Sequence, residues 1–215
     1  MMTNKLELVF ILDRSGSMAG LEDDTIKGFN SLLNKQRNEV GEAIITTVLF
    51  DHSYELLHDR INLKSIRNIT DKEYYVRGST ALLDAIGYTI DKIGNVQKVT
   101  QEEHRADKVL FVITTDCMEN SSRKFNYKMI KRMIENQKRK YNWEFIFMGS
   151  NMDAISVANN FGIDANRAVN YHSDQKGTSL NFESMSKVVS KLRSSNSIDD
   201  EWKKEIEDDY NLREK

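Results

Sequence analysis

Two runs of almost uninterrupted apolar residues most strongly constrain how this chain can fold. They are residues 6–12 (LELVFIL) and residues 108–114 (KVLFVIT). A strand with one face in water alternates polar and apolar residues, whereas a strand covered on both faces forms a continuous apolar run. The sequence therefore predicts a central sheet that is covered on both faces.

Helical segments separate the expected strands. Residues 25–40 and 80–93 repeat apolar side chains at every third or fourth position, as one face of a helix requires. Strands that alternate with helices predict an α/β fold with a doubly wound, mostly parallel sheet and helices on both faces. The expected strands are residues 6–12, 43–50, 54–63, 108–114, 143–148 and 167–171, and the expected helices are residues 25–40, 80–93, 127–139, 152–160 and 180–192.

One connection between strands is too short to hold a helix. Residues 43–50 and 54–63 are joined only by Asp51, His52 and Ser53. So short a turn requires the two strands to pair in antiparallel fashion. The second strand is also the more polar, which indicates an edge of the sheet. We therefore expect one antiparallel edge strand.

Size and charge limit the classes of protein to consider. We expect one domain over residues 1–195, followed by a charged helix or tail over residues 196–215. The net charge is -2, from 31 basic and 33 acidic residues, so neither nucleic acid nor a membrane surface is expected as a partner. No apolar stretch approaches the roughly 20 residues of a membrane span, and the first ten residues do not resemble a signal peptide. Cys117 is the single cysteine, and a cytoplasmic location is expected. The oligomeric state is left open.

Oxygen-bearing side chains gather in three loops. Asp13, Ser15 and Ser17 follow the first apolar strand, Thr80 precedes a helix, and Asp116 follows the second apolar strand. Ligand sites in such sheets lie beyond the carboxyl ends of the strands, where the strand order reverses. Hydroxyls and carboxylates, with no set of histidines or thiolates, suit a hard cation such as Mg²⁺. In the first loop, Gly16 allows a tight backbone and Arg14 is expected to point away, toward solvent or a partner.

These motifs resemble those of a known family. Asp13 to Ser17 (DRSGS) resembles the Asp-x-Ser-x-Ser motif of the metal-ion-dependent adhesion site in von Willebrand factor type A domains, and the sequence resembles the intracellular branch of that family more than the adhesion receptors. Residues 78–80 (GST) are similar to its Gly-x-Thr segment, and residues 115–116 to its Thr-Asp pair. One residue departs from the pattern, because Cys117 stands where the family commonly has glycine.

The resemblance implies roles for five residues. Ser15, Ser17 and Thr80 would give hydroxyl ligands to Mg²⁺, or to Mn²⁺ or Ca²⁺, while Asp13 and Asp116 would act mainly through bound waters. It also implies a protein-binding module rather than an enzyme. Because the direct ligands are neutral, the cation would keep positive charge for a Glu or Asp side chain donated by a protein partner.

Other interpretations of the same residues stay open from the sequence. Asp13, Ser15 and Thr80 are also natural helix caps, and Asp116 suits an ordinary turn. A metal-dependent hydrolase of the haloacid dehalogenase type also places an aspartate after a buried strand, but it needs a second aspartate at the position of Ser15. A scaffold with a vestigial metal site is the third alternative. For Cys117, a small buried apolar side chain and a thiol bordering the site are both considered.

Overall fold

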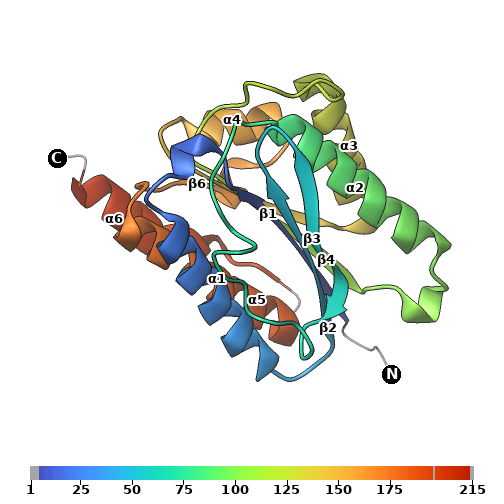
Figure 1. Cartoon of the computed structure of the whole chain (residues 1–215). Helices are drawn as coiled ribbons and strands as arrows, with labels where there is room; N and C mark the ends of the chain where they lie inside the picture. Colours follow the sequence, from blue (N-terminus) through green and yellow to red (C-terminus); the bar gives the residue numbers. More distant parts are fainter. Residues whose placement is uncertain (1–4, 196, 214–215) are drawn as a thin grey trace.

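A six-stranded sheet forms the centre of the fold (Figure 1). The computed structural model describes residues 5–195 and 197–213. The strand order is β3-β2-β1-β4-β5-β6, and every neighbouring pair is parallel except β2 and β3, which are antiparallel. The predicted α/β sheet with one antiparallel edge strand is confirmed. The strands are β1 (Leu6–Asp13), β2 (Ala43–Phe50), β3 (Tyr54–Asn62), β4 (Lys108–Thr115), β5 (Glu144–Gly149) and β6 (Ala168–Asn170).

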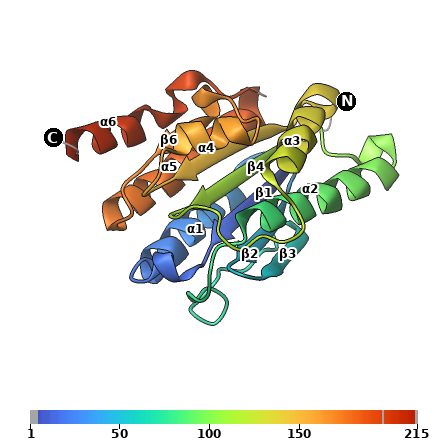
Figure 2. The same ribbon diagram turned by 90° about the horizontal axis from the view of Figure 1, so that it is seen from above.

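Helices cover both faces of this sheet (Figures 1 and 2). The first face carries α1, α5 and α6, and the second carries α2, α3 and α4. The helices are α1 (Glu22–Arg37), α2 (Leu82–Val99), α3 (Tyr127–Tyr141), α4 (Ala154–Asn160), α5 (Gln175–Ser195) and α6 (Lys204–Arg213), with short 3-10 turns η1 (Gly16–Met18), η2 (Glu102–His104), η3 (Ala165–Arg167) and η4 (Asp200–Lys203).

The continuous apolar run of β1 is explained by these two layers. Leu8 and Phe10 pack in the core beneath α1 and α5, while Val9 and Ile11 pack in the core beneath α2 and α3. All eight side chains of β1 are buried. Since successive side chains of a strand point to opposite faces, both sets must be apolar.

Glu7 is a charged residue in the interior of β1. Its side chain is fully buried, and its carboxylate accepts hydrogen bonds from Arg60 Nε at 2.8 Å and from Gln97 of α2. A buried charge is tolerated when it is paired and hydrogen-bonded in this way. Arg60 lies where the pairing of β2 and β3 is irregular, and its φ of 51° is left-handed.

Two helices begin earlier than their apolar periodicity predicts. The first starts at Glu22, because the acidic residues of its first turn interact favourably with the helix amino terminus. The last starts at Gln175 rather than at residue 180. Asp174 accepts a hydrogen bond from Gly177 N at 2.8 Å, which caps this end of α5.

The charged C-terminal segment lies against the first face of the sheet. Ile198, Trp202 and Ile206 belong to the same apolar core as α5. Residue 196 and residues 214–215 of this segment lie outside the described residues, as do residues 1–4. The division of the chain after residue 195 stays a prediction. In the part of the chain that the structure describes, no helix is long and apolar enough to cross a membrane.

Candidate metal centre

The strand order reverses between β1 and β4, and the side chains singled out in the sequence meet there. β1 ends at Asp13, and β4 ends at Thr115, directly before Asp116. The two strands pair in parallel, so their carboxyl ends lie side by side. Thr115 Oγ1 donates a hydrogen bond of 2.6 Å to Asp13 Oδ2. This contact joins the first and third predicted loops.

The first loop turns its hydroxyls toward Asp116. Asp13 Oδ1 accepts a hydrogen bond of 2.7 Å from Ser15 N, which folds the loop back on itself. Ser15 Oγ lies 2.9 Å from Ser17 Oγ, and the Ser17 hydroxyl donates to Asp116 Oδ1. Asp13, Ser15 and Asp116 are buried, whereas Ser17 is exposed. The loop therefore places an exposed hydroxyl beside buried carboxylates.

The second loop approaches the first through its backbone. Gly16 N donates a hydrogen bond of 3.0 Å to Gly78 O. Gly78 has a left-handed φ of 69°, and a Cβ there would lie 2.1 Å from His52 Nδ1. Both the conformation and the space require glycine at this position.

Thr80 is not a helix cap. The structure places the N-cap of α2 at Ala81, and side chains that follow β4 accept from the first turn of this helix: Leu83 N donates to Glu119 at 2.8 Å and Asp84 N donates to Ser122 Oγ at 3.0 Å. The Thr80 backbone N–H instead donates to Asn120 Oδ1 at 2.9 Å, and Thr80 Oγ1 lies 2.8 Å from Cys117 Sγ. The capping interpretation of Thr80 is therefore wrong, and its hydroxyl faces the third loop.

Burial makes the two aspartates costly to ionise. Burial raises the pKa of Asp13 to about 6. Hydrogen bonds from Thr115 and Ser15 lower this pKa, and repulsion from the nearby Asp116 raises it. Burial also raises the pKa of Asp116, although a hydrogen bond from Ser17 opposes it. Within the described chain, neither carboxylate forms an ion pair with a lysine or arginine. A bound cation would remove this cost, because an opposite charge at short range favours the ionised form.

The donor set fits a divalent cation. Donor atoms of Asp13, Asp116 and Cys117 lie within 4.8 Å of one another, and Thr80 touches the thiol of this cluster. Asp13, Ser15, Ser17 and Asp116 are thus joined by direct contacts, and Thr80 joins them through Cys117. Their roles as ligands stay a prediction.

Arg14 contradicts the expectation of a contact with solvent or a partner. Its side chain does point away from the site, but it is fully buried. Its Nε donates to Asp51 Oδ2 at 2.9 Å, and its Nη2 donates to Glu55 at 2.6 Å. Arg77 also donates to Asp51, at 2.8 Å. Arg14 therefore ties the first loop to the β2–β3 hairpin, a role that its neighbours in sequence do not indicate.

Two further contacts that support Asp13 were missed by the sequence reasoning. The sequence identified Thr115 only as part of the Thr-Asp pair and indicated no role for its hydroxyl. Tyr74 lies in an irregular segment without periodicity, yet it is buried and its hydroxyl donates to Asp13 O at 2.5 Å. The only sequence signal for Tyr74 is that it is an aromatic residue within a polar loop.

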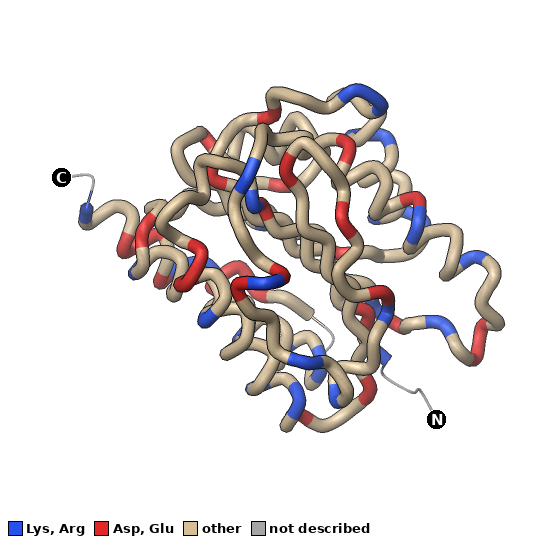
Figure 3. Tube along the Cα trace, in the orientation of Figure 1, with Lys and Arg blue, Asp and Glu red and all other residues tan. Residues whose placement is uncertain are grey.

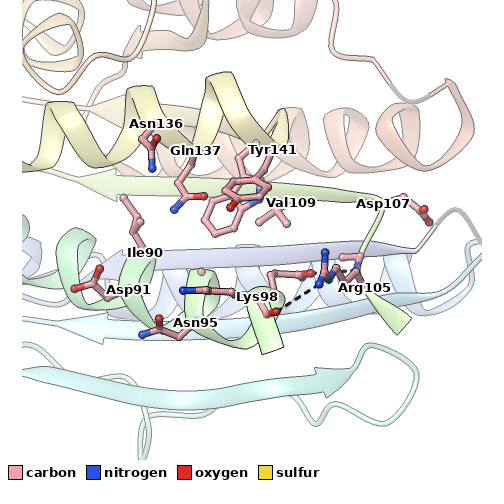
Figure 4. A pocket seen from close by; sticks show the side chains of 14 residues that line it. Ile90, Asp91, Asn95, Lys98, Arg105, Asp107, Val109, Asn136, Gln137 and Tyr141 are labelled. Carbon is pink, nitrogen blue, oxygen red and sulfur yellow. Dashed lines mark hydrogen bonds between the residues drawn. The ribbon is translucent and has the colours of Figure 1, made fainter. Parts of the chain in front are cut away.

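A separate pocket of about 320 Å³ lies at the other end of the sheet, between α2 and α3 (Figure 4). It opens beside the first residues of β4, including Val109, and not beside the strand ends that carry Asp13 and Asp116. Arg105 at its rim donates to Thr100 O at 2.7 Å. The pocket is therefore distinct from the candidate metal centre.

Charged side chains are spread over the whole molecule. Figure 3 shows lysine and arginine interspersed with aspartate and glutamate along the trace. Many of them are paired on the surface, for example Lys92 with Asp59 at 2.9 Å and Lys138 with Asp164 at 2.6 Å. Such pairs contribute little to stability and give no single-sign field.

Comparison with known proteins shows the fold. No family model matches this sequence, and a comparison with curated proteins finds no match. One similar solved structure is that of proximal thread matrix protein 1 from the mussel byssus, with zinc in its metal-ion-dependent adhesion site (MIDAS) motif. It is 12% identical with a TM-score of 0.58, over 87% of this chain and 46% of that one.

Two further structures give the same result. A mutant of the PilB minor pilin from Streptococcus sanguinis is 14% identical with a TM-score of 0.60, over 90% of this chain and 64% of that one. The von Willebrand factor type A structure from Catenulispora acidiphila is 13% identical with a TM-score of 0.59, over 86% of this chain and 42% of that one. The chain thus spans less than two thirds of these solved chains, and it adopts the von Willebrand factor type A fold.

Proposed function

We propose that this chain, with its von Willebrand factor type A fold, is a protein-binding module that acts through a divalent cation and is not an enzyme. Ser15, Ser17 and Thr80 would hold the cation directly, while Asp13 and Asp116 would hold its waters. One observation carries the proposal: two buried carboxylates without a cationic side chain lie beside the hydroxyls of Ser15 and Ser17 at the switch point of the sheet, and the Thr80 hydroxyl joins this cluster through Cys117. The zinc-occupied motif of the mussel protein supports it by analogy of fold.

The charge of the site determines the kind of partner. The hydroxyl donors are neutral, and the two aspartates offset the charge of the cation only from a distance. A bound cation would thus supply a partly uncompensated positive charge to the open side of the site, where Ser17 and Met118 are exposed. A carboxylate gains a direct contact with an ion there, in a region already partly shielded from water. We therefore infer that the protein partner donates a Glu or Asp side chain.

The oxygen donors favour Mg²⁺, with Mn²⁺ or Ca²⁺ as substitutes. We place the protein in the cytoplasm, since a single cysteine suits a reducing compartment.

Catalysis of the haloacid dehalogenase type is disfavoured because Ser15 occupies the position of the required general acid, and a hydroxyl does not serve that role at neutral pH.

The first experiment measures metal binding by thermal unfolding. Mg²⁺ or Mn²⁺ at about 100 times its Kd should raise the Tm of the wild type by about 5–10 °C, because it binds only the folded state. Asp13→Ala and Ser17→Ala should each remove most of this shift. Asp91→Ala is the matched control, since Asp91 is exposed and lines the pocket at the opposite end of the sheet. Equal shifts in the wild type and in both site variants would contradict the proposal.

The second experiment identifies the partner and its acidic residue. Partners are captured from the native cell in Mg²⁺ and eluted with EDTA, and the affinity of a purified partner is then measured with and without the metal. Thr80→Ala should weaken binding about tenfold or more, whereas Thr80→Ser retains the hydroxyl and should bind normally. Replacement of one acidic residue on the partner should have the same effect as Thr80→Ala. A partner affinity that does not change when EDTA removes the metal would rule out this mode of recognition.

A further inference from the structure

Cys117 lies among the donors of the candidate metal centre. It follows Asp116 directly after β4, and its side chain is half-buried. Its Sγ lies 2.8 Å from Thr80 Oγ1, and it shares a cluster with carboxylate oxygens of Asp13 and Asp116 in which all donor atoms lie within 4.8 Å. The thiol therefore faces the same point as the oxygen donors.

The apolar interpretation of Cys117 does not fit its surroundings. A cysteine that acts as a small apolar side chain is packed in a core. Cys117 belongs to neither apolar core cluster of the described chain, and it is not among the partly buried apolar side chains packed against them. Its nearest polar neighbours are the Thr80 hydroxyl and the Met118 carbonyl. The sulfur thus borders a polar site.

The spacing of these donors suits a single ion. With bonds of about 2.3 Å to sulfur and about 2.1 Å to oxygen, donors on opposite sides of one ion are about 4.4 Å apart, and adjacent donors are about 3 to 3.5 Å apart. The 2.8 Å contact and the 4.8 Å limit lie a few tenths of an ångström outside this range. Thr115 Oγ1, whose single proton is donated to Asp13 Oδ2, also lies 3.0 Å from Cys117 O, which places the Cys117 backbone next to that contact.

We propose that Cys117 is a sulfur donor to the cation of this site, and that it raises the affinity of the site for Zn²⁺ and other thiophilic divalent cations above that of the oxygen donors alone. This inference rests on the metal-binding function proposed above and adds one ligand to it. Thiolate sulfur is a strong ligand for Zn²⁺, Cd²⁺ and Co²⁺, whereas Mg²⁺ prefers oxygen. The thiol proton passes to solvent when the sulfur binds the ion.

The test uses ultraviolet absorption of the full chain with Co²⁺ or Cd²⁺. A thiolate bound to either ion gives a sulfur-to-metal charge-transfer band, and Cys117 is the single cysteine of the chain, so any such band is assigned without ambiguity. The wild type should show the band, and Cys117→Ser should lack it. In competition titrations, Zn²⁺ affinity should fall at least tenfold in Cys117→Ser. Mg²⁺ affinity should change less than about threefold, since the oxygen donors remain.

The outcomes separate this inference from the proposed function. Stabilisation of the wild type by Zn²⁺ or Co²⁺ without a charge-transfer band would overturn the sulfur ligand and leave the metal-dependent module intact. If neither Mg²⁺ nor Zn²⁺ stabilises the wild type, both proposals are overturned. The band is measured on the wild type, so its result does not depend on whether a variant folds. Cys117→Ala serves as a second variant, and each variant is checked by its far-ultraviolet circular dichroism.

Discussion

Arg14 Nε donates a hydrogen bond of 2.9 Å to Asp51 Oδ2, and both side chains are fully buried. Arg14 belongs to the loop that carries Ser15 and Ser17, while Asp51 follows β2. Burial by itself would raise the pKa of Asp51, but hydrogen bonds from Arg77, Ser53 and Arg14 outweigh it and lower that pKa. The pair thus connects the loop of residues 13–17 to the β2–β3 hairpin, on the side of the loop that points away from the candidate metal centre.

Arg14→Met should destabilise the fold by about 3 kcal/mol, because it leaves a buried carboxylate with only one of its two cationic partners. The free energy of unfolding in urea measures this loss. Arg77→Met is the matched control, since Arg77 bonds the same carboxylate but its side chain is 41% exposed. It should cost about 1 kcal/mol or less. Equal losses in the two variants would show that the burial of Arg14 is unimportant.

Gly78→Ala should lower stability by more than a left-handed backbone alone explains. Gly20 has a φ of 91° with open space around it, so Gly20→Ala measures the backbone cost, about 1–2 kcal/mol. At Gly78 the new Cβ also meets His52, which should add to that cost. His52→Ala should recover the additional part when combined with Gly78→Ala. A loss in Gly78→Ala no greater than in Gly20→Ala would contradict the contact.

The stability of the metal-free protein should depend on the protonation of Asp13. Its pKa is raised from 3.8 to about 6 on folding, so the folded state binds this proton more tightly than the unfolded chain. The stabilisation is complete below pH of about 4 and is lost as the pH rises through about 6. Its size is about 3 kcal/mol, from a shift of about two pKa units in a buried group.

The measurement compares wild type and Asp13→Asn in EDTA, by urea unfolding between pH 4 and pH 7. Asparagine cannot ionise, so the difference between the two proteins isolates Asp13 from other carboxylates, some of which act in the opposite direction. The wild type should lose stability relative to Asp13→Asn as the pH rises. Saturating Mg²⁺ should reduce this loss, since the cation stabilises the ionised form. Parallel pH profiles in EDTA would mean that Asp13 titrates normally.

Trp202→Ala should destabilise the whole fold by about 3 kcal/mol, because it leaves a cavity between η4 and α5. Trp202 Nε1 also donates to Asn166 O at 2.8 Å, which links the C-terminal segment to η3. A single unfolding transition at lower temperature would show that residues 197–213 fold together with the sheet. Two separate transitions would show an independent segment, as the predicted boundary at residue 195 allows. Lys204→Ala, at a more exposed position of the same segment, is the control.

Much of the fold was predictable because its signals are local. The apolar runs of β1 and β4 identify strands buried on both faces, and the three-residue connection after Phe50 requires an antiparallel hairpin. Strands that alternate with helices then determine which ends of the strands meet. This is why Asp13 and Asp116 could be assigned to one site although they are far apart in sequence.

Only the tertiary structure decided which way individual side chains turn. Arg14 and Ser15 are neighbours in one loop, yet one is buried against Asp51 and the other faces Asp116 through Ser17. Thr80 is a residue type that often caps a helix, but the third loop lies close to it in the fold, and its hydroxyl contacts Cys117 instead. Composition and periodicity determine which face of an element is apolar, because that depends on spacing along the chain. The direction of a polar side chain depends on which partners the rest of the fold brings within hydrogen-bonding distance, and those partners come from distant parts of the sequence.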